Sequence, residues 1–366
     1  MAFTREELAF LATADLSVEL GLTKKTLLDD ARLARAAYGD HARAVMELLT
    51  ARASGKVPRD WFVDTDSVQQ ATPLPVARER SRRIGERLVH DVTCSIGTEG
   101  LYAQGPWLGS DLDVGRLEMA RLNLGDPWLV RADALTPVSR GAVIVADPAR
   151  RSGGRRIRDT IPPLPDLIDA WAGHEMAIKC APGIDYSEWD GLVSVSSVGG
   201  GVKETCLYTG GLAGRERREA VIHGTFLDRI TDLEPDDVGA GAPGRYLIDP
   251  DGAVVRAGLV RHFARREGLW MLDERIAYVT GDSIPAGYSG FEILEQVPLK
   301  RLRAALKPYG PGSLEILVRG VDVDPDQLRK KLAPKGSRPM AVVVTRIGST
   351  GVALICAERE HREAVA

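Results

Sequence analysis

The sequence predicts an α/β protein with a doubly wound, Rossmann-like sheet in the middle of the chain, a helical region before it and a small α+β region after it. From Leu88 onward, short apolar runs alternate with helix-like stretches, and several runs are apolar on both faces, as buried parallel strands are. Residues 1–72 show helical patterns instead, and after about Gly210 the alternation ends. The 366 residues suffice for two or three domains.

Composition excludes several classes of protein. With 44% hydrophobic residues, 27% charged residues and a net charge of -3, the chain is an ordinary globular protein, and any RNA site must be a local basic patch. The four cysteines lie far apart, which argues against a zinc ribbon or a disulfide framework. The acidic N-terminus is no signal peptide and no long apolar run occurs. We therefore expect a cytoplasmic protein without a metal or a membrane span, of unknown oligomeric state.

The N-terminal region, residues 1–72, is predicted to be a helical domain. Thr4 and Glu7 have the spacing of a capping box at its first helix. The stretches TKKTLLDDARLARAAYGD and HARAVMELLTARASG continue the helical pattern. The segment Arg59 to Pro75 has no steady period and indicates a linker, so we place a domain border near Thr72, before the helix VARERSRRIGERL.

The middle region, residues 73–212, is predicted to hold the sheet. Its helices are DVGRLEMARLNLG, with Asp113 as its N-cap and Gly125 just past its end, and LPDLIDAWAG. Its strands are LVHDVTC, WLGSD, PWLV, AVIVAD, EMAIKC, LVSVSS and ETCLY.

The C-terminal region mixes strands with a helix. The segment through ERREA and TDLEPDDVGAGAPG has no readable order and indicates a surface loop or a linker. Further on, SLEILVRG and MAVVVTRI are predicted strands on either side of DPDQLRKKL, a helix with Asp324 as N-cap and Pro325 as its first residue.

Acidic residues follow three successive predicted strands. Asp91 precedes a tight turn in which Gly97 is expected to enter a helix, and such a turn brings backbone N–H groups close to a ligand. Asp111 ends the next strand, where a carboxylate can accept two ribose hydroxyls, and Asp133 after the third suits an adenine amino group. Any one of these acids could instead cap a helix, but their coincidence favours a nucleoside site. A dinucleotide site would need G-x-G-x-x-G, which is absent.

This order of acids resembles S-adenosylmethionine-dependent methyltransferases of class I. Asp147-Pro148-Ala149-Arg150 resembles the acid-Pro-Pro-aromatic motif with which many of them hold a target nitrogen. More narrowly, residues 76–356 resemble bacterial methyltransferase-like proteins with a C-terminal THUMP-like domain, a match carried by DVTCSIGTEG, DLDVGRLEMARLN, DPARRSGGRR, KCAPGID, VGGGVKET and LEILVRGVDVDPDQLRKKL. The resemblance implies a ferredoxin-like segment at 244–288, a THUMP-like domain at 289–360 and an RNA substrate, tRNA or rRNA, since THUMP domains bind structured RNA.

The resemblance also implies roles for individual residues. Asp147 and Pro148 would lie at the reacting end. Lys179, Lys203 and Glu204 match family motifs, but the motifs assign them no role. Around the cofactor S-adenosylmethionine we expect Asp91, Thr93, Gly97, Glu99, Asp111 and Asp133. Substrate RNA would meet Arg150, Arg151, Arg155 and Arg156 beside the site, and Arg319, Lys330 and Lys331 in the THUMP-like domain.

Two alternatives remain open at this stage. Thr93 and Ser95 stand where the family has glycines, and Arg150 stands where it has an aromatic residue, which motivates a non-catalytic scaffold that binds the cofactor or RNA. A methyltransferase acting on a small molecule or a protein is the other alternative. The arginine-rich segment 150–156 is expected to be a loop and, like the basic residues of the last helix, can be merely solvated.

Overall fold

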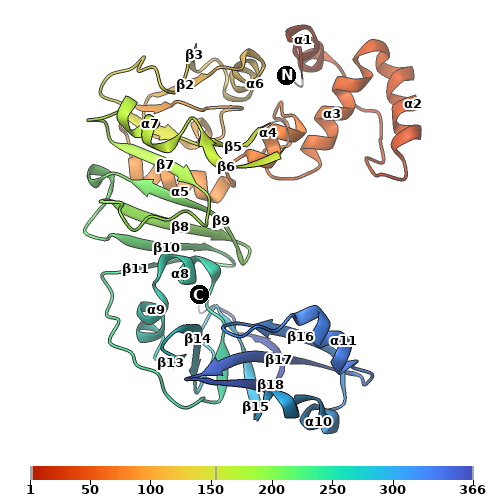
Figure 1. The fold of residues 1–366 in the computed structure, drawn as a ribbon. Helices are drawn as coiled ribbons and strands as arrows, with labels where there is room; N and C mark the ends of the chain where they lie inside the picture. The colour runs from red at the N-terminus through yellow and green to blue at the C-terminus, as the bar shows by residue number, and fades with distance from the viewer. Residues whose placement is uncertain (1–2, 153–154, 365–366) are drawn as a thin grey trace. The chain divides into compact units, whose positions relative to one another are not determined.

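The chain forms two compact units. The computed structural model describes residues 3–152 and 155–364, with the side chains of residues 150–159 outside the described part. Unit 1 comprises residues 1–193 and 203–214, and unit 2 comprises residues 194–202 and 215–366 (Figure 1). The sequence-based borders at 72, 212, 244 and 288 stay predictions. Among the described helices, none has both the length and the apolar character needed to cross a bilayer.

The elements of unit 1 alternate strands and helices after a run of helices. Its helices are α1 (Arg5–Thr13), α2 (Leu27–Tyr38), α3 (Ala42–Arg52), α4 (Thr65–Gln70), α5 (Leu74–Ile84), α6 (Val114–Leu124) and α7 (Leu164–Ala170). Its strands are β1 (Val89–Asp91), β2 (Trp107–Asp111), β3 (Trp128–Arg131), β4 (Val143–Ala146), β5 (Ala149–Ser152), β6 (Arg155–Ile161), β7 (Met176–Cys180) and most of β9 (Gly201–Tyr208).

The main sheet of unit 1 has the strand order β9-β7-β4-β1-β2-β3. Strands β3, β2, β1, β4 and β7 run parallel, and β9 is antiparallel to β7. The chain moves outward from β1 to β3 and then returns to the other side of β1 with β4. This reversal makes the carboxyl ends of β1 and β4 the switch point of the sheet, where ligands of such folds bind. The predicted α/β fold class is confirmed.

The sequence patterns explain these elements. Every residue of β1, β4 and β7 is buried, as expected for strands covered on both faces. At α6, Asp113 accepts hydrogen bonds from the N–H groups of Gly115 and Arg116, and Gly125 ends the helix in the left-handed region. Thr4 and Glu7 form the predicted capping box of α1.

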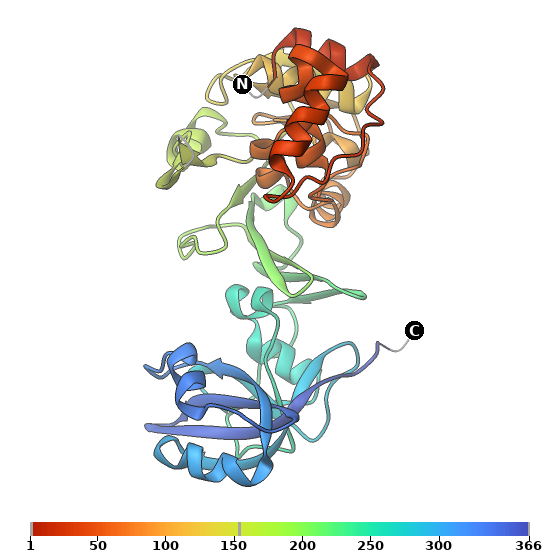
Figure 2. The ribbon, with the colours of Figure 1, turned by 90° about the vertical axis from the view of Figure 1, so that its right-hand side faces the viewer.

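The N-terminal helices belong to the core of unit 1. Leu8 on α1 and Leu48 on α3 pack in one apolar cluster with Ile96, after β1, and Met119 on α6. Figure 2 shows these red-to-orange helices beside the yellow strand–helix segment. The predicted linker before residue 75 contains a short helix, α4, which escaped the sequence analysis because its six residues are too few for a visible period.

Two hairpins of the chain also escaped prediction. Residues 150–156 were expected to be a loop, but β5 and β6 pair with each other in a two-stranded antiparallel sheet. The segment after Gly210, which showed no order, contains the antiparallel pair β10 (Arg218–His223) and β11 (Leu227–Thr231). Both depend on contacts between two paired strands, and the hydrophobic pattern of a single strand does not reveal such contacts.

Unit 2 is built on antiparallel strands. Its remaining sheet has the order β13-β14-β12-β15-β18-β17-β16, in which only β16 and β17 run parallel. The predicted helix α11 begins at Pro325, and Asp324 caps it. Besides β10 and β11, the helices of unit 2 are α8 (Gly252–Ala257), α9 (Val260–Arg266), α10 (Leu302–Leu306) and α11 (Pro325–Leu332). Its strands are β12 (Tyr246–Ile248), β13 (Trp270–Asp273), β14 (Ile276–Gly281), β15 (Ser289–Pro298), β16 (Pro311–Val318), β17 (Arg338–Ile347) and β18 (Thr350–His361). Strand β8 (Leu192–Val198) is shared between the two units.

Candidate functional site

A cavity of about 610 Å³ lies in unit 1 at the carboxyl ends of the parallel strands. Its size is in the range of small-molecule sites. Four predicted aspartates line it, because each stands at or just after the end of a parallel strand and these strands end at the same edge of the sheet: Asp91 ends β1, Asp111 ends β2, Asp133 follows β3 and Asp147 follows β4. Their side chains come from four strands and converge on one space.

Asp111 is held by the backbone around it. Its Oδ2 accepts the N–H of Ser95 at 3.1 Å, and its Oδ1 accepts the N–H of Asp113 at 2.9 Å. Burial raises the pKa of Asp111, although these N–H groups and Arg116 oppose the rise. Each carboxylate oxygen has a second lone pair, so the fixed carboxylate can still accept two hydroxyl groups. Asp133 is exposed at the cavity wall, and its Oδ1 accepts the N–H of Leu135 at 2.9 Å.

The turn after β1 differs from its prediction at Gly97. This glycine has φ +88° and leads into turns and a short 3-10 helix (Gly100–Tyr102), so the expected helix start is wrong. This φ, which L side chains rarely adopt, explains the glycine, and a Cβ there would also lie 2.7 Å from Leu124 Cδ1. It is not among the cavity residues, whereas Thr93, Ser95 and Glu99 are.

Thr93 and Ser95 have definite structural consequences in place of the family's glycines. The Thr93 hydroxyl accepts the backbone N–H of Asp147 at 2.7 Å and so joins the ends of β1 and β4. Ser95 has φ +49°, a left-handed conformation that costs a non-glycine residue about 1 kcal/mol or more. The turn therefore keeps a glycine-like backbone at Ser95.

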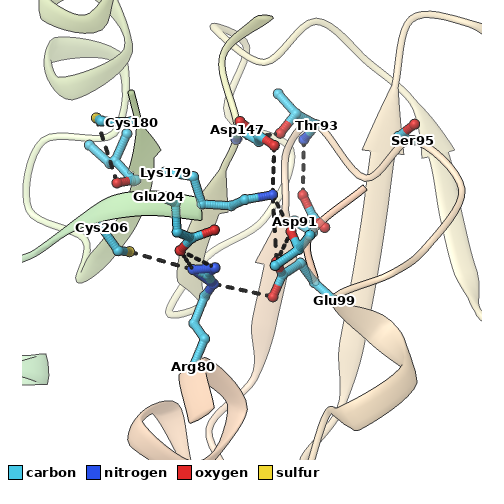
Figure 3. Close-up of polar contacts among 12 residues, drawn as sticks. Arg80, Asp91, Thr93, Ser95, Glu99, Asp147, Lys179, Cys180, Glu204 and Cys206 are labelled. Carbon is cyan, nitrogen blue, oxygen red and sulfur yellow. Dashed lines mark hydrogen bonds and ion pairs between the residues drawn. The ribbon is translucent and has the colours of Figure 1, made fainter. Parts of the chain in front are cut away.

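Arg80, on α5, is a fully buried cation that pairs with Glu99, one of the cavity residues (Figure 3). Its Nη1 and Nη2 lie 2.9 and 2.6 Å from Glu204 Oε1, and its Nε donates to Glu99 Oε2 at 3.2 Å. Burial lowers the pKa of the guanidinium, but Glu204 and Glu99 outweigh burial and raise it well above its ordinary value. Glu99 is kept ionised in return: burial raises its pKa, and the stronger combined effect of Arg80 and Lys179 leaves it lowered.

Lys179, on β7, connects this pair to the cavity. Its Nζ lies 2.6 Å from Asp147 Oδ2 and 3.7 Å from Glu99 Oε1, and it donates to the hydroxyl of Thr72. Thr72 in turn donates to Glu99 Oε1 at 2.8 Å. One hydrogen-bonded network thus joins the segment before α5, the turn after β1 and the ends of β4 and β7. Figure 3 shows its members Glu99, Asp147 and Lys179.

Asp91 lies deepest among the cavity acids. It is 3% exposed, and burial together with the charges of Glu99 and Asp147 raises its pKa to about 8, although Lys179 and the N–H of Thr93 lower it. The group carries its proton at neutral pH in the ligand-free chain. A cation entering the cavity beside Asp91 would stabilise its ionised form.

Two members of this network, Arg80 and Thr72, were not predicted from the sequence. Arg80 follows Val76 and Ala77 at helical spacing and precedes Ile84, so a charge on the apolar face of α5 was a visible signal. Thr72 had no such signal. Lys179 and Glu204 were noticed only through family motifs, and Arg116, which lines the cavity, was not singled out.

The predicted substrate residues lie in different surroundings. Pro148 is buried beside Asp147 and is not among the cavity residues. Arg319 pairs with Asp249 at 2.9 Å and lies over the ring of Tyr278. Of the predicted RNA-binding residues, Lys330 and Lys331 on α11 are exposed. The other four lie in β5 and β6, and their side chains are outside the described part: Arg150, Arg151, Arg155 and Arg156. Among the residues that the structure describes, no group of three or more His, Cys, Asp or Glu is arranged for a metal ion.

Comparisons with known proteins agree with the geometry. Residues 288–358 match the family model described as THUMP domain-like. Two curated proteins, each named an uncharacterized S-adenosylmethionine-dependent methyltransferase, from Mycobacterium tuberculosis strains CDC 1551 / Oshkosh and ATCC 25618 / H37Rv, are 47% identical over 354 residues, covering 88% of this chain and 98% of theirs. A solved "putative methyltransferase" from Porphyromonas gingivalis W83 shares the fold, with a TM-score of 0.71, 17% identity and coverage of 97% of this chain and 99% of its own.

Proposed function

The chain belongs to the S-adenosylmethionine-dependent methyltransferases, and from this premise we propose that it methylates a nitrogen atom of an RNA base, in tRNA or rRNA. The observation that carries the proposal is the convergence of Asp91, Asp111, Asp133 and Asp147 on one cavity at the switch point of the sheet. The THUMP-like match at residues 288–358 supports RNA as the substrate.

The lining of the cavity fits the cofactor. Asp111 keeps free lone pairs for the two ribose hydroxyls, and the exposed carboxylate of Asp133 suits the adenine amino group. Ile96, Leu112 and Leu135 supply apolar surface for the adenine ring. Buried acids at the other side, Asp91 above all, suit a ligand that carries positive charge.

The chemistry of methyl transfer leaves the protein with positioning as its main task. The cofactor supplies a methyl group on a sulfonium, and an acceptor must approach that group in line. Asp147 would accept a hydrogen of the target nitrogen, and the Pro148 carbonyl would accept a second. An unpaired or flipped-out base could reach these groups, whereas a base inside a duplex could not.

The cofactor site is tested first by calorimetry. Wild type should bind S-adenosylmethionine saturably, and Asp111→Ala should weaken binding about 30-fold or more, because hydrogen bonds to a charged group contribute roughly 1.5–3 kcal/mol each. Asp126→Ala, an exposed acid at the far end of α6, is the control and should bind like wild type. Equal affinity of all three proteins would refute the assignment of Asp111.

The acceptor is tested by transfer of tritium from the labelled cofactor to unmodified tRNA and rRNA transcribed in vitro. Methylation of a base supports the proposal. Binding of the cofactor without transfer to any RNA would refute the RNA substrate and leave a small molecule or a protein as the acceptor.

The role of α11 needs a separate measurement. Reversing both charges with Lys330→Glu and Lys331→Glu should weaken RNA binding and lower the slope of log affinity against log salt by about 2, since each phosphate contact contributes about one unit. The control reverses Lys24 and Lys25, an adjacent exposed pair in unit 1. An equal loss of RNA affinity in both double variants would mean that RNA binding depends on the overall charge of the protein and not on α11.

A further inference from the structure

Lys179 and Asp147 occupy matching positions at the ends of neighbouring parallel strands. The register of β4 and β7 pairs Ile144 with Met176 and Ala146 with Ile178, so the next residue of each strand is Asp147 or Lys179. Their side chains turn toward each other at the same edge of the sheet, and Nζ lies 2.6 Å from Oδ2 (Figure 3). The contact is therefore set by strand register and not by a chance meeting of flexible side chains.

The ammonium group of Lys179 is fixed from three sides. Besides Asp147 it donates to the Thr72 hydroxyl and lies 3.7 Å from Glu99 Oε1. The lysine side chain is 9% exposed, so little water competes for its hydrogens. Glu99 is itself fixed by Arg80 and Thr72. Movement of the ammonium group would break several buried polar contacts at once. Each break would leave a buried polar group without a hydrogen-bond partner, which costs free energy.

Asp147 is fixed at one carboxylate oxygen and at its backbone. Oδ2 meets Lys179, and the backbone N–H donates to the Thr93 hydroxyl at 2.7 Å. The other oxygen, Oδ1, has no donor among the side chains that the structure describes, and the side chain is 33% exposed at the cavity. One oxygen is anchored and the other is available to a ligand.

The charges explain why a cation is needed here. Three acids, Glu99, Asp147 and Glu204, form ion pairs with two cations, Arg80 and Lys179. Although burial lowers the pKa of Lys179, Asp147, Glu99 and Glu204 raise it overall, so the lysine stays charged and cannot act as a proton acceptor. Its contribution is a fixed positive charge and fixed hydrogen-bond geometry.

We infer that Lys179 is a positioning residue, which anchors Oδ2 of Asp147 so that Oδ1 faces the methyl acceptor as a hydrogen-bond acceptor. The inference rests on the proposed function, because it assigns Asp147 to the acceptor. A carboxylate whose Oδ2 accepts from the Lys179 ammonium can only accept hydrogen bonds at Oδ1, so the acceptor atom must carry a hydrogen. An exocyclic amine of a base meets this requirement, and a ring nitrogen without hydrogen does not.

The test compares Lys179→Met, Asp147→Asn and the double variant in the full chain, with the exposed Lys56→Met as control. We measure kcat and KM for tritium transfer to the RNA that wild type methylates, the cofactor Kd by calorimetry, and thermal unfolding. Lys179→Met should lower kcat about tenfold or more and change the cofactor Kd by less than about threefold, because lost positioning acts in the transition state. Lys179→Gln, which keeps N–H donors without the charge, replaces Lys179→Met if the latter does not fold.

The double variant separates positioning from stability. Asparagine needs no counter-charge, and its carbonyl oxygen still accepts a hydrogen bond. The kcat of the double variant should therefore be about fivefold or more above that of Lys179→Met alone. Such a gain is not expected if the two substitutions act independently. Additive losses, or a kcat of Lys179→Met within about twofold of wild type, would overturn the inference alone. Binding of the cofactor by wild type without methylation of any RNA would overturn the proposed function and this inference together.

Discussion

Replacing Asp91 by asparagine removes a carboxyl group whose ionisation opposes folding. The group is 3% exposed at the end of β1, and burial, with Glu99 and Asp147 nearby, raises its pKa from 3.8 to about 8. Asparagine has nearly the same shape, and its carbonyl oxygen can still accept the N–H of Thr93, which lies 3.2 Å from Asp91 Oδ1. The variant therefore removes the titration and preserves the contact.

The sign of the effect follows from proton binding. Between pH 4 and pH 8 the folded chain holds a proton on Asp91 that the unfolded chain has released, so the free energy of unfolding falls as pH rises through this range. At about 1.4 kcal/mol per pH unit, the advantage of Asp91→Asn over wild type should grow by at most about 4 kcal/mol from pH 5 to pH 8 and then level off. The figure is an upper limit, because water entering the cavity would raise the local dielectric and weaken these charge interactions.

The assay is urea unfolding of the ligand-free chain at pH 5, 7 and 9, followed by tryptophan fluorescence. Five of the six tryptophans lie in unit 1, so the signal reports mainly on the unit that contains Asp91. Asp40→Asn, an exposed acid of the same unit, is the control and should not change the pH trend. A difference between Asp91→Asn and wild type that is the same at all three pH values would refute the reasoning.

Three further predictions concern the same network. The affinity of wild type for S-adenosylmethionine should rise between pH 6 and 7.5 by at most about tenfold per unit, because Asp91 must lose its proton beside the cationic ligand, and calorimetry of Asp91→Asn should give a flatter profile. Arg80→Met should lower the free energy of unfolding of unit 1 by about 3–5 kcal/mol in urea, because it leaves Glu204 buried without its cation. The control Arg82→Met breaks an exposed ion pair on the same helix and should cost about 1 kcal/mol or less. Similar losses in both variants would mean that the buried ion pair stabilises the chain no more than the exposed one. Thr93→Val should slow methyl transfer about tenfold, because it leaves the backbone N–H of Asp147 without its acceptor. Thr93→Ser keeps the hydroxyl and should react at the rate of wild type. A slow serine variant would contradict the role of the Thr93 hydroxyl in positioning Asp147.

The alternation of strands and helices, and with it the acids of the cavity, was readable in the sequence. Asp111 and Asp147 stand directly at the ends of apolar runs, and parallel topology alone brings such positions to one edge. Asp113 and Gly125 marked the ends of α6 because caps act within a few residues. These features depend on local order along the chain, which a single sequence contains.

The network around Lys179 was decided by tertiary structure. Arg80 and Glu204 are 124 positions apart, and Thr72 and Lys179 are 107 apart, so no local period relates them. The hairpin β5-β6 and the pair β10-β11 depend likewise on a partner strand. The sequence by itself predicted which acids lie at the strand ends around the cavity, and only the folded chain determined that Arg80 and Lys179 pair with Glu99, Glu204 and Asp147. The physical reason is that the cost of burying a charge depends on neighbours that folding alone brings within a few ångströms.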